Sequence, residues 1–567
     1  MHLIMQTTYM KKVLLAAAFC IAGAVHAQYN TLWIPDTISG TSFTLNLNDT
    51  SKQFFPGPVT ATEAVNGSFW GPTLFINKGD SVHMTVNNNL MDTTTIHWHG
   101  MHLPAVMDGG PHQPIPPGTT WSPYWKMDNH AATYWYHPHM HMMALHQITQ
   151  GLGGFLIVRD SAEAALNLPR TYGSDDIPLA LTDRRFTPNN VLVDATYGDT
   201  MLVNGTLNPQ HNVPAQIVRF RILNAATERC YNLGFSDNRT FYVIGNDGGL
   251  VDTPVAVTRV LLCSAERVEI LVNFSGQQSQ SFDLMAYNQS LPPGVPGFEG
   301  QLAAPPILNA LGARDFNILH LNVMAQTANP VTAVPAVLVS NSYWSSSNPD
   351  ATRTVTISDT TISGAPAFLM NHHIFDMNYI DYVVPLNNLE VWNITNSSNV
   401  IGHPFHIHDI EFHILNRNGN PPKIFERGWK DVVFVAPGET VSYVTKFTDF
   451  ADTIHPFMFH CHIAAHEDGG LMGQFVVADL SAGISEIKSA DGEISIFPNP
   501  SENIFNIEVK KEMRNAVVEI FDMLGEKIFS EPFTGLAKQV FLNAPAGIYM
   551  VRIKSNEGEQ SLRVLKQ

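Results

Sequence analysis

Short apolar runs recur along the chain, separated by turn residues such as Gly, Pro, Asn and Asp. In chain order the clearest are residues 43–47, 73–76, 82–86, 154–158, 217–223, 268–272, 390–394 and 440–444. Short strands at such spacing are typical of all-β sandwiches. The sequence shows no sustained helical period, coiled coil or transmembrane stretch. It therefore predicts an all-β protein.

The runs fall into blocks that predict several domains, because 567 residues exceed what one core accommodates. Residues 161–176 and the Asn-, Ser- and Pro-rich residues 325–350 separate the blocks, and composition shifts toward Lys and Glu after residue 480. We predict three β-sandwich domains and a small C-terminal module, at residues 28–160, 177–324, 351–480 and 481–567.

The N-terminus has the order of a secretory signal peptide. Lys11 and Lys12 precede an apolar run at residues 13–25, and a small-residue cleavage site ends at Ala27. The run is shorter than the about 20 residues that a bilayer-spanning helix needs. We expect residues 1–27 to be removed and the protein to be secreted or attached to the cell surface.

Charge and cysteine content narrow the function classes. A net charge of -18 argues against nucleic acid or an anionic membrane as partner. Outside the signal peptide the cysteines are Cys230, Cys263 and Cys461, an odd count that leaves one thiol to explain. A Cys230–Cys263 disulfide and two separate buried thiols both remain open, because sequence does not give the Cα separation.

Histidines recur in alternating pairs. Chance spacing of 24 histidines would give about one His-x-His, whereas five occur, four of them at residues 97–99, 137–139, 406–408 and 460–462. On a strand both imidazoles of a pair lie on one face. The pairs predict a multi-metal cluster between the first and third domains, with more ligands than the four that satisfy structural zinc.

Cys461 lies between His460 and His462. Alternation sends its thiol to the opposite face of a strand, and His466 is close enough in sequence to return to that face. A thiolate with imidazoles is the ligand set of a blue-copper electron-transfer site. One tripeptide can therefore serve two metal sites back to back.

Four runs resemble the copper motifs of multicopper oxidases: His97-Trp98-His99-Gly100, Tyr136-His137-Pro138-His139, His403-Pro404-Phe405-His406-Ile407-His408, and His460-Cys461-His462 through His466. The resemblance covers roughly residues 28–480, and residues 108–111 and 428–431 make it look closest to bacterial copper-efflux oxidases, spore-coat laccases and bilirubin oxidases. It implies three cupredoxin-like Greek-key β-sandwich domains.

The resemblance also implies four copper ions and their ligands. The type 1 copper would be held by His403, Cys461 and His466, and the type 2 copper by His97 and His406. The type 3 pair would be held by His99, His137, His139, His408, His460 and His462. Electrons from a reducing substrate would enter at the type 1 copper and pass through Cys461 to the cluster that reduces dioxygen to water.

Three further residues carry expectations from the resemblance. Glu467 and Asp108 match acidic residues that assist proton delivery; the alternatives are a loop-shaping salt bridge for Glu467 and a turn cap for Asp108. The axial position of the type 1 site falls on Leu471, with Met472 one residue later. A non-coordinating Leu471 would favour a higher potential.

Two other features bear on the substrate. The segment from Met140 to His146 holds three Met and two His, and either packs in the core or binds an extra copper, since thioethers favour Cu(I). The Met-rich segment typical of copper-efflux oxidases is missing before His403. We therefore expect a laccase-like oxidase of phenols or aromatic amines, with a metal-ion oxidase and a non-catalytic copper-binding surface protein as alternatives.

The C-terminal module resembles the sorting domain of proteins exported by the type IX secretion system. The resemblance is carried by Phe497-Pro498-Asn499-Pro500-Ser501, the Asp522-x-x-Gly525 turn and residues 546–553. It implies a small β-sandwich that interacts with secretion machinery.

Overall fold

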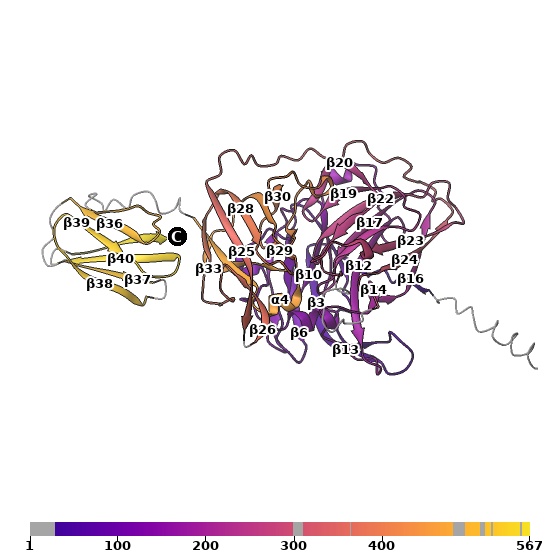
Figure 1. The fold of residues 1–567 in the computed structure, drawn as a ribbon, viewed down its shortest axis with the longest axis horizontal. Helices are drawn as coiled ribbons and strands as arrows, with labels where there is room; N and C mark the ends of the chain where they lie inside the picture. Colours follow the sequence, from indigo (N-terminus) through magenta and orange to yellow (C-terminus); the bar gives the residue numbers. More distant parts are fainter. Residues whose placement is uncertain are drawn as a thin grey trace, which may run out of the picture.

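The computed structural model describes residues 29–298, 310–362, 364–479, 494–510, 516–522, 525–555 and 558–567. The predicted signal peptide lies outside them. Regular structure in the described residues is mostly β-strand (Figure 1), as predicted. The α-helices there are short: α2 (Ala144–Gln150), α3 (Ser161–Ala164) and α4 (Ala464–Asp468). In the described part of the chain, none is long and apolar enough to cross a membrane.

The first sandwich packs two sheets around a core that includes Phe43, Leu45 and Trp98. Its strands are β2 (Thr37–Ser39), β3 (Ser42–Lys52), β4 (Thr60–Val65), β5 (Thr73–Asn77), β6 (Ser81–Asn89), β7 (His97–His99), β8 (Thr120–Trp121), β9 (Tyr124–Lys126), β10 (Ala132–His137) and β11 (Gly154–Arg159). One sheet has the order β2-β5-β11-β10-β7, and the other β4-β3-β6-β8, with β9 on β6. The metal-ligand strand β7 thus forms one edge of the first sheet, and the metal-ligand strand β10 lies beside it.

The second sandwich has the largest sheets. Its strands are β1 (Asn30–Thr31), β12 (Asp176–Phe186), β13 (Leu192–Val193), β14 (Thr200–Val203), β15 (Thr206–Leu207), β16 (Pro209–Pro214), β17 (Ile217–Asn224), β18 (Tyr231–Phe235), β19 (Phe241–Asn246), β20 (Gly249–Val257), β21 (Val260–Leu262), β22 (Arg267–Asn273), β23 (Ser281–Tyr287) and β24 (Asp315–Met324). The orders are β1-β16-β24-β23-β18-β21 and β15-β14-β12-β17-β22-β19-β20, with β13 on β12.

Two features tie the second sandwich to distant parts of the chain. The N-terminal strand β1 pairs with β16 although first-sandwich residues follow it in sequence. Val331 and Leu338, from the connection after β24, pack against Leu250 and Leu271. Cys230 and Cys263 flank the β18–β21 pair and form a disulfide with a Cα separation of 4.1 Å, which closes the question that the sequence left open.

The third sandwich contains Cys461 and Trp392 in its core. Its strands are β25 (Ala351–Ile362), β26 (Ala365–Met370), β27 (Tyr382–Pro385), β28 (Leu389–Asn396), β29 (His403–Ile407), β30 (Phe412–Arg417), β31 (Val432–Val435), β32 (Thr440–Lys446), β33 (Asp452–Cys461) and β34 (Met472–Ala478). The sheet orders are β26-β25-β28-β32-β30 and β27-β34-β33-β29-β31.

The C-terminal module is a smaller β-sandwich that lies beside the third one (Figure 1, yellow). Its strands are β35 (Ile494–Phe497), β36 (Ile504–Val509), β37 (Ala516–Phe521), β38 (Lys527–Phe533), β39 (Ala537–Phe541), β40 (Gly547–Ser555) and β41 (Gly558–Lys566), in sheets β35-β36-β39 and β38-β37-β40-β41. Leu565 of the module packs against Val383, Val476 and Ala478 of the third sandwich.

Candidate metal centre

Strand pairing aligns the histidine pairs within each sandwich. In the first sandwich His97 on β7 lies opposite His137 on β10, and Trp98 points into the core. In the third, His406 on β29 lies opposite His460 on β33. Cys461, the next residue, belongs to the core of that sandwich. Alternation along a strand therefore separates the imidazoles from the thiol.

Eight histidines from the first and third sandwiches meet in one buried cluster. His139 Nε2 lies 3.1 Å from His460 Nε2, which lies 3.2 Å from His408 Nε2. His99 Nδ1 lies 3.2 Å from His137 Nε2. None of the eight side chains is more than 4% exposed; the set is His97, His99, His137, His139, His406, His408, His460 and His462.

Five of these imidazoles have one ring nitrogen held by an oxygen atom. Burial lowers the pKa of His139 and His460 to about 3. Oxygen atoms hold the Nδ1 atoms of five rings at 2.7–3.1 Å, those of His97, His137, His406, His408 and His460. Such outer contacts fix a ring and leave Nε2 for a metal.

Three nitrogens show the fit to metal ions most directly. Nε2 of His97, His406 and His462 is buried and has no hydrogen-bond partner among the described residues. His99 is turned the other way, because its Nε2 lies 3.3 Å from Asp431 Oδ1 and its Nδ1 faces His137. Buried and unpaired imidazole nitrogens are what copper, zinc or iron would bind.

A second group surrounds Cys461. Its Sγ lies 3.4 Å from His403 Nδ1 and 3.8 Å from His466 Nδ1. Burial raises the pKa of the Cys461 thiol well above its usual value and lowers the pKa of His466 to about 3. Since the apolar surroundings disfavour a bare thiolate, a bound soft cation is what would stabilise it here. His466 is partly exposed, whereas His403 and Cys461 are buried.

Leu471 and Met472 face different neighbours. Leu471 is fully buried in the apolar cluster that contains Cys461, and its carbonyl accepts a hydrogen bond from Cys461 N at 3.1 Å. Met472 packs with Met458 and Phe375 instead. The two side chains therefore belong to separate apolar clusters, with Leu471 in that of the thiol.

The two predicted acids both contact the histidine cluster. Asp108 Oδ2 accepts a hydrogen bond from His408 Nδ1 at 2.7 Å. Glu467 Oε1 lies 3.1 Å from His139 Nδ1, and Oε2 lies 3.4 Å from His460 Nδ1. Neither Glu467 oxygen has a partner with hydrogen-bond geometry in the described part of the chain. Burial raises the pKa of Glu467, so this carboxyl can hold a proton.

Sequence reasoning missed a buried junction of all three sandwiches. Asp431 contacts His99 from the first sandwich, and its carbonyl accepts a hydrogen bond from His406 Nδ1 at 2.8 Å. Arg267 of the second sandwich binds Asp431 Oδ1 at 2.7 Å. Asp431 was part of a family motif, but no local pattern pointed to Arg267.

The segment from Met140 to His146 does not converge on one point. His141 packs against Phe375, whereas His146 Nδ1 lies 2.8 Å from Asp194 Oδ2. Met142 is 71% exposed. These contacts do not form the thioether cluster that the extra Cu(I) site required, and that site stays without support.

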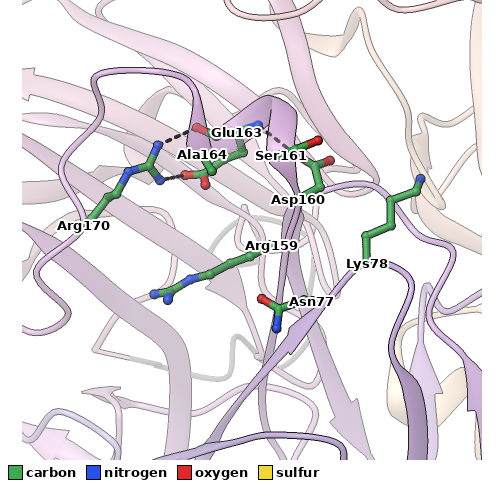
Figure 2. A pocket seen from close by; sticks show the side chains of 8 residues that line it. All are labelled: Asn77, Lys78, Arg159, Asp160, Ser161, Glu163, Ala164 and Arg170. Atoms are coloured by element: carbon green, nitrogen blue, oxygen red, sulfur yellow. Dashed lines mark hydrogen bonds and ion pairs between the residues drawn. The ribbon is translucent and has the colours of Figure 1, made fainter.

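Two cavities formed by described residues are lined by residues other than the predicted ligands. One of about 520 Å³ is lined by charged groups, and Figure 2 shows Arg170 turned to Glu163 while Lys78 and Arg159 point to different sides. Another, of about 590 Å³, includes Tyr343 and His413. Neither cavity therefore belongs to the two metal-ligand groups.

Family comparisons agree with this geometry. Models described as multicopper oxidase match residues 49–163, 176–296 and 345–481. The chain is 30% identical over 447 residues to multicopper oxidase mco of Staphylococcus haemolyticus, covering 77% of this chain and 89% of that relative. The chain belongs to the multicopper oxidase family. This multicopper oxidase is accordingly an oxidoreductase that binds copper.

Solved structures place the fold in the same family. A laccase-like multicopper oxidase CueO from Ochrobactrum sp. is 31% identical with a TM-score of 0.70, over 79% of this chain and all of that one. A multicopper oxidase from Campylobacter jejuni, described as a metallo-oxidase, is 25% identical with a TM-score of 0.67, over 80% and 96%. The predicted three cupredoxin-like sandwiches are confirmed.

The C-terminal module of the multicopper oxidase has its own match. A model described as a secretion system C-terminal sorting domain covers residues 495–567. The predicted sorting domain is confirmed, and it indicates an exported protein.

Proposed function

We propose that this multicopper oxidase is laccase-like: it couples one-electron oxidation of phenolic or aromatic amine donors to the four-electron reduction of dioxygen to water. The observation that carries the proposal is the position of Cys461. Its thiol belongs to one metal-ligand group, while its neighbours His460 and His462 belong to the other. The peptide bonds between them form a short covalent path between the two groups.

The proposed ligands follow the two groups. His403, Cys461 and His466 would hold a type 1 copper, and His97 and His406, with free Nε2 atoms, a type 2 copper. A type 3 pair would be held by the remaining six histidines, His99, His137, His139, His408, His460 and His462. Bound copper supplies one-electron exchange with the donor and multi-electron transfer to dioxygen.

The chain's own acids would handle the protons. Reduction of dioxygen to water consumes four protons, so proton-holding groups beside the cluster are needed. Glu467 touches His139 and His460, and Asp108 hydrogen bonds to His408. We assign Glu467 to hold and deliver protons, and Asp108 to orient His408 on the same route.

Surroundings of the partly exposed His466 favour an aromatic donor. The ring of Phe368 on β26 lies 4.4 Å from the ring of His466 and 4.9 Å from that of His403. Phe368 is partly exposed and lies beside both histidines, so it adds an aromatic surface near them with which a phenol or aromatic amine can pack.

A metal-ion oxidase for Cu(I), Mn(II) or Fe(II) is the second candidate. Exposed Asp359 lies directly opposite Phe368 in the β25–β26 pair. Opposed residues of an antiparallel pair project to the same face. A carboxylate there offers a metal ion an oxygen ligand near His466.

Oxygen uptake by the copper-loaded protein separates these functions. We expect faster uptake with a substituted phenol than with Cu(I), Mn(II) or Fe(II). The substitution Phe368→Ala should change kcat/KM for the phenol, and Asp359→Asn should not. Faster uptake with a metal ion, lost in Asp359→Asn, would favour the second candidate. A blue protein that consumes no oxygen with any donor would indicate a non-catalytic copper-binding surface protein.

A further inference from the structure

His146, outside the proposed copper ligands, lies between two carboxylates. Its Nδ1 is 2.8 Å from Asp194 Oδ2, and its Nε2 is 3.8 Å from Glu63 Oε1. His146 is on α2, Glu63 on β4, and Asp194 directly follows β13. Three segments distant in sequence therefore bring one imidazole and two carboxylates together.

Glu63 is the unusual member of this group. Its side chain is only 8% exposed, and Oε2 has no hydrogen-bond partner among the described residues. Burial, together with the nearby carboxylates of Asp49, Asp92 and Asp194, raises the pKa of Glu63 to about 7. Buried carboxylates are normally paired or bind metals, and the contact of Glu63 with the partly exposed His146, at 3.8 Å, is longer than a hydrogen bond.

We propose that Glu63 and His146 bind a divalent metal cation, with Asp194 orienting the His146 ring. Metal–nitrogen and metal–oxygen bonds are about 2.0–2.2 Å long, so a nitrogen and an oxygen 3.8 Å apart can share one ion. Asp194 on Nδ1 leaves Nε2 for the metal, as in carboxylate–histidine–metal arrangements. One imidazole, one carboxylate and water suit Mn²⁺, Fe²⁺ or Zn²⁺ better than Cu(I).

A metal ion at this site would hold helix α2 against strand β4. The first backbone N–H groups of α2, those of Ala144 and Leu145, donate to the Asp468 carboxylate at 3.0 Å. Asp468 is the last residue of α4, next to Glu467. A cation between Glu63 and His146 would therefore hold α2 against β4, while Asp468 holds the first residues of α2.

The proposal is tested with Zn²⁺, which has no redox chemistry. Its binding to the copper-loaded full chain is measured by calorimetry and by metal analysis after equilibrium dialysis. We expect one Zn²⁺ beyond the copper content. Glu63→Gln and His146→Gln should each weaken its binding at least tenfold, and Asp194→Asn by about 10–100-fold, the usual effect of an outer partner. His83→Gln, which removes an exposed histidine stacked on Tyr124, is the matched control and should bind like the wild type.

Asp194 is 43% exposed, so Asp194→Asn should fold normally, which copper content and the far-ultraviolet circular dichroism spectrum check. Equal Zn²⁺ binding by the wild type and all three site variants would overturn the proposal, as would no Zn²⁺ uptake by the wild type. A loss of binding in His83→Gln of the same size would show scattered surface binding and would also overturn it. Oxidase activity is not needed for any of these readouts.

Discussion

The two metal-ligand groups are only one residue apart in sequence but differ in how the fold builds them. The eight-histidine cluster draws on two sandwiches, is buried throughout, and is braced by Asp431 and Arg267 at a junction of three. The Cys461 group lies within the third sandwich and leaves His466 partly exposed. A small gas needs no wide opening, whereas an electron donor must come near a ligand. Under the proposed function, this difference would separate oxygen reduction at the histidine cluster from electron entry at the Cys461 group.

Removing the Cys461 thiolate should have the largest effect on the difference between the two metal-ligand groups. Cys461→Ser replaces a soft ligand by a hydroxyl, so the blue absorption should disappear. Oxidase activity should fall by more than the roughly 10–100-fold typical of outer-ligand changes. Absorption and oxygen uptake measure this, and the low-temperature EPR signal of copper in the histidine cluster should persist. Retained activity would mean that electrons reach the cluster by another route.

Asp431→Asn should weaken the contacts of Asp431 with Arg267 and His99 that hold the histidine cluster in place. The change leaves the guanidinium of Arg267 buried without its main charge partner, at a cost of roughly 3–5 kcal/mol. The apparent Tm should fall, and copper content of the histidine cluster should drop while the blue absorption is retained. Asp283→Asn is the control: Asp283 pairs with His320 in a partly exposed contact of the second sandwich, so its loss should cost less than about 1 kcal/mol. Equal effects would show that the junction has no special role.

Glu467→Gln should slow the chemistry of the cluster and spare electron entry. Since an amide cannot deliver a proton as a carboxyl does, turnover should fall by roughly 10²-fold, the lower end for acid–base groups. Stopped-flow reoxidation of reduced enzyme measures the step directly. The neighbouring Asp468→Asn is a matched control, because Asp468 contacts α2 and should alter the rate much less. Unchanged reoxidation in Glu467→Gln would reject the proton role.

Sequence patterns predicted the two metal-ligand groups better than the contacts that hold these groups in place. Strand alternation predicted that His460 on β33 lies on the opposite face from the Cys461 thiol, so this was readable without a structure. β33 ends at Cys461, so alternation does not extend to His462. The contact of Arg267 with Asp431 depends on how three sandwiches dock, and no local period encodes that docking. The same holds for β1, which joins the second sandwich, and for His146, whose partner Asp194 comes from a different block.

The smallest predicted effect concerns the axial side of the Cys461 group. Leu471→Met places a thioether in the apolar cluster that contains the thiol, and axial coordination should lower the potential of the copper there. Redox titration of the blue absorption measures the shift, and the histidine cluster should not change. Met472→Leu is the matched control, because Met472 packs with Met458 and Phe375 and should leave the potential as it is. A shift in Met472→Leu, with none in Leu471→Met, would place the axial position one residue later.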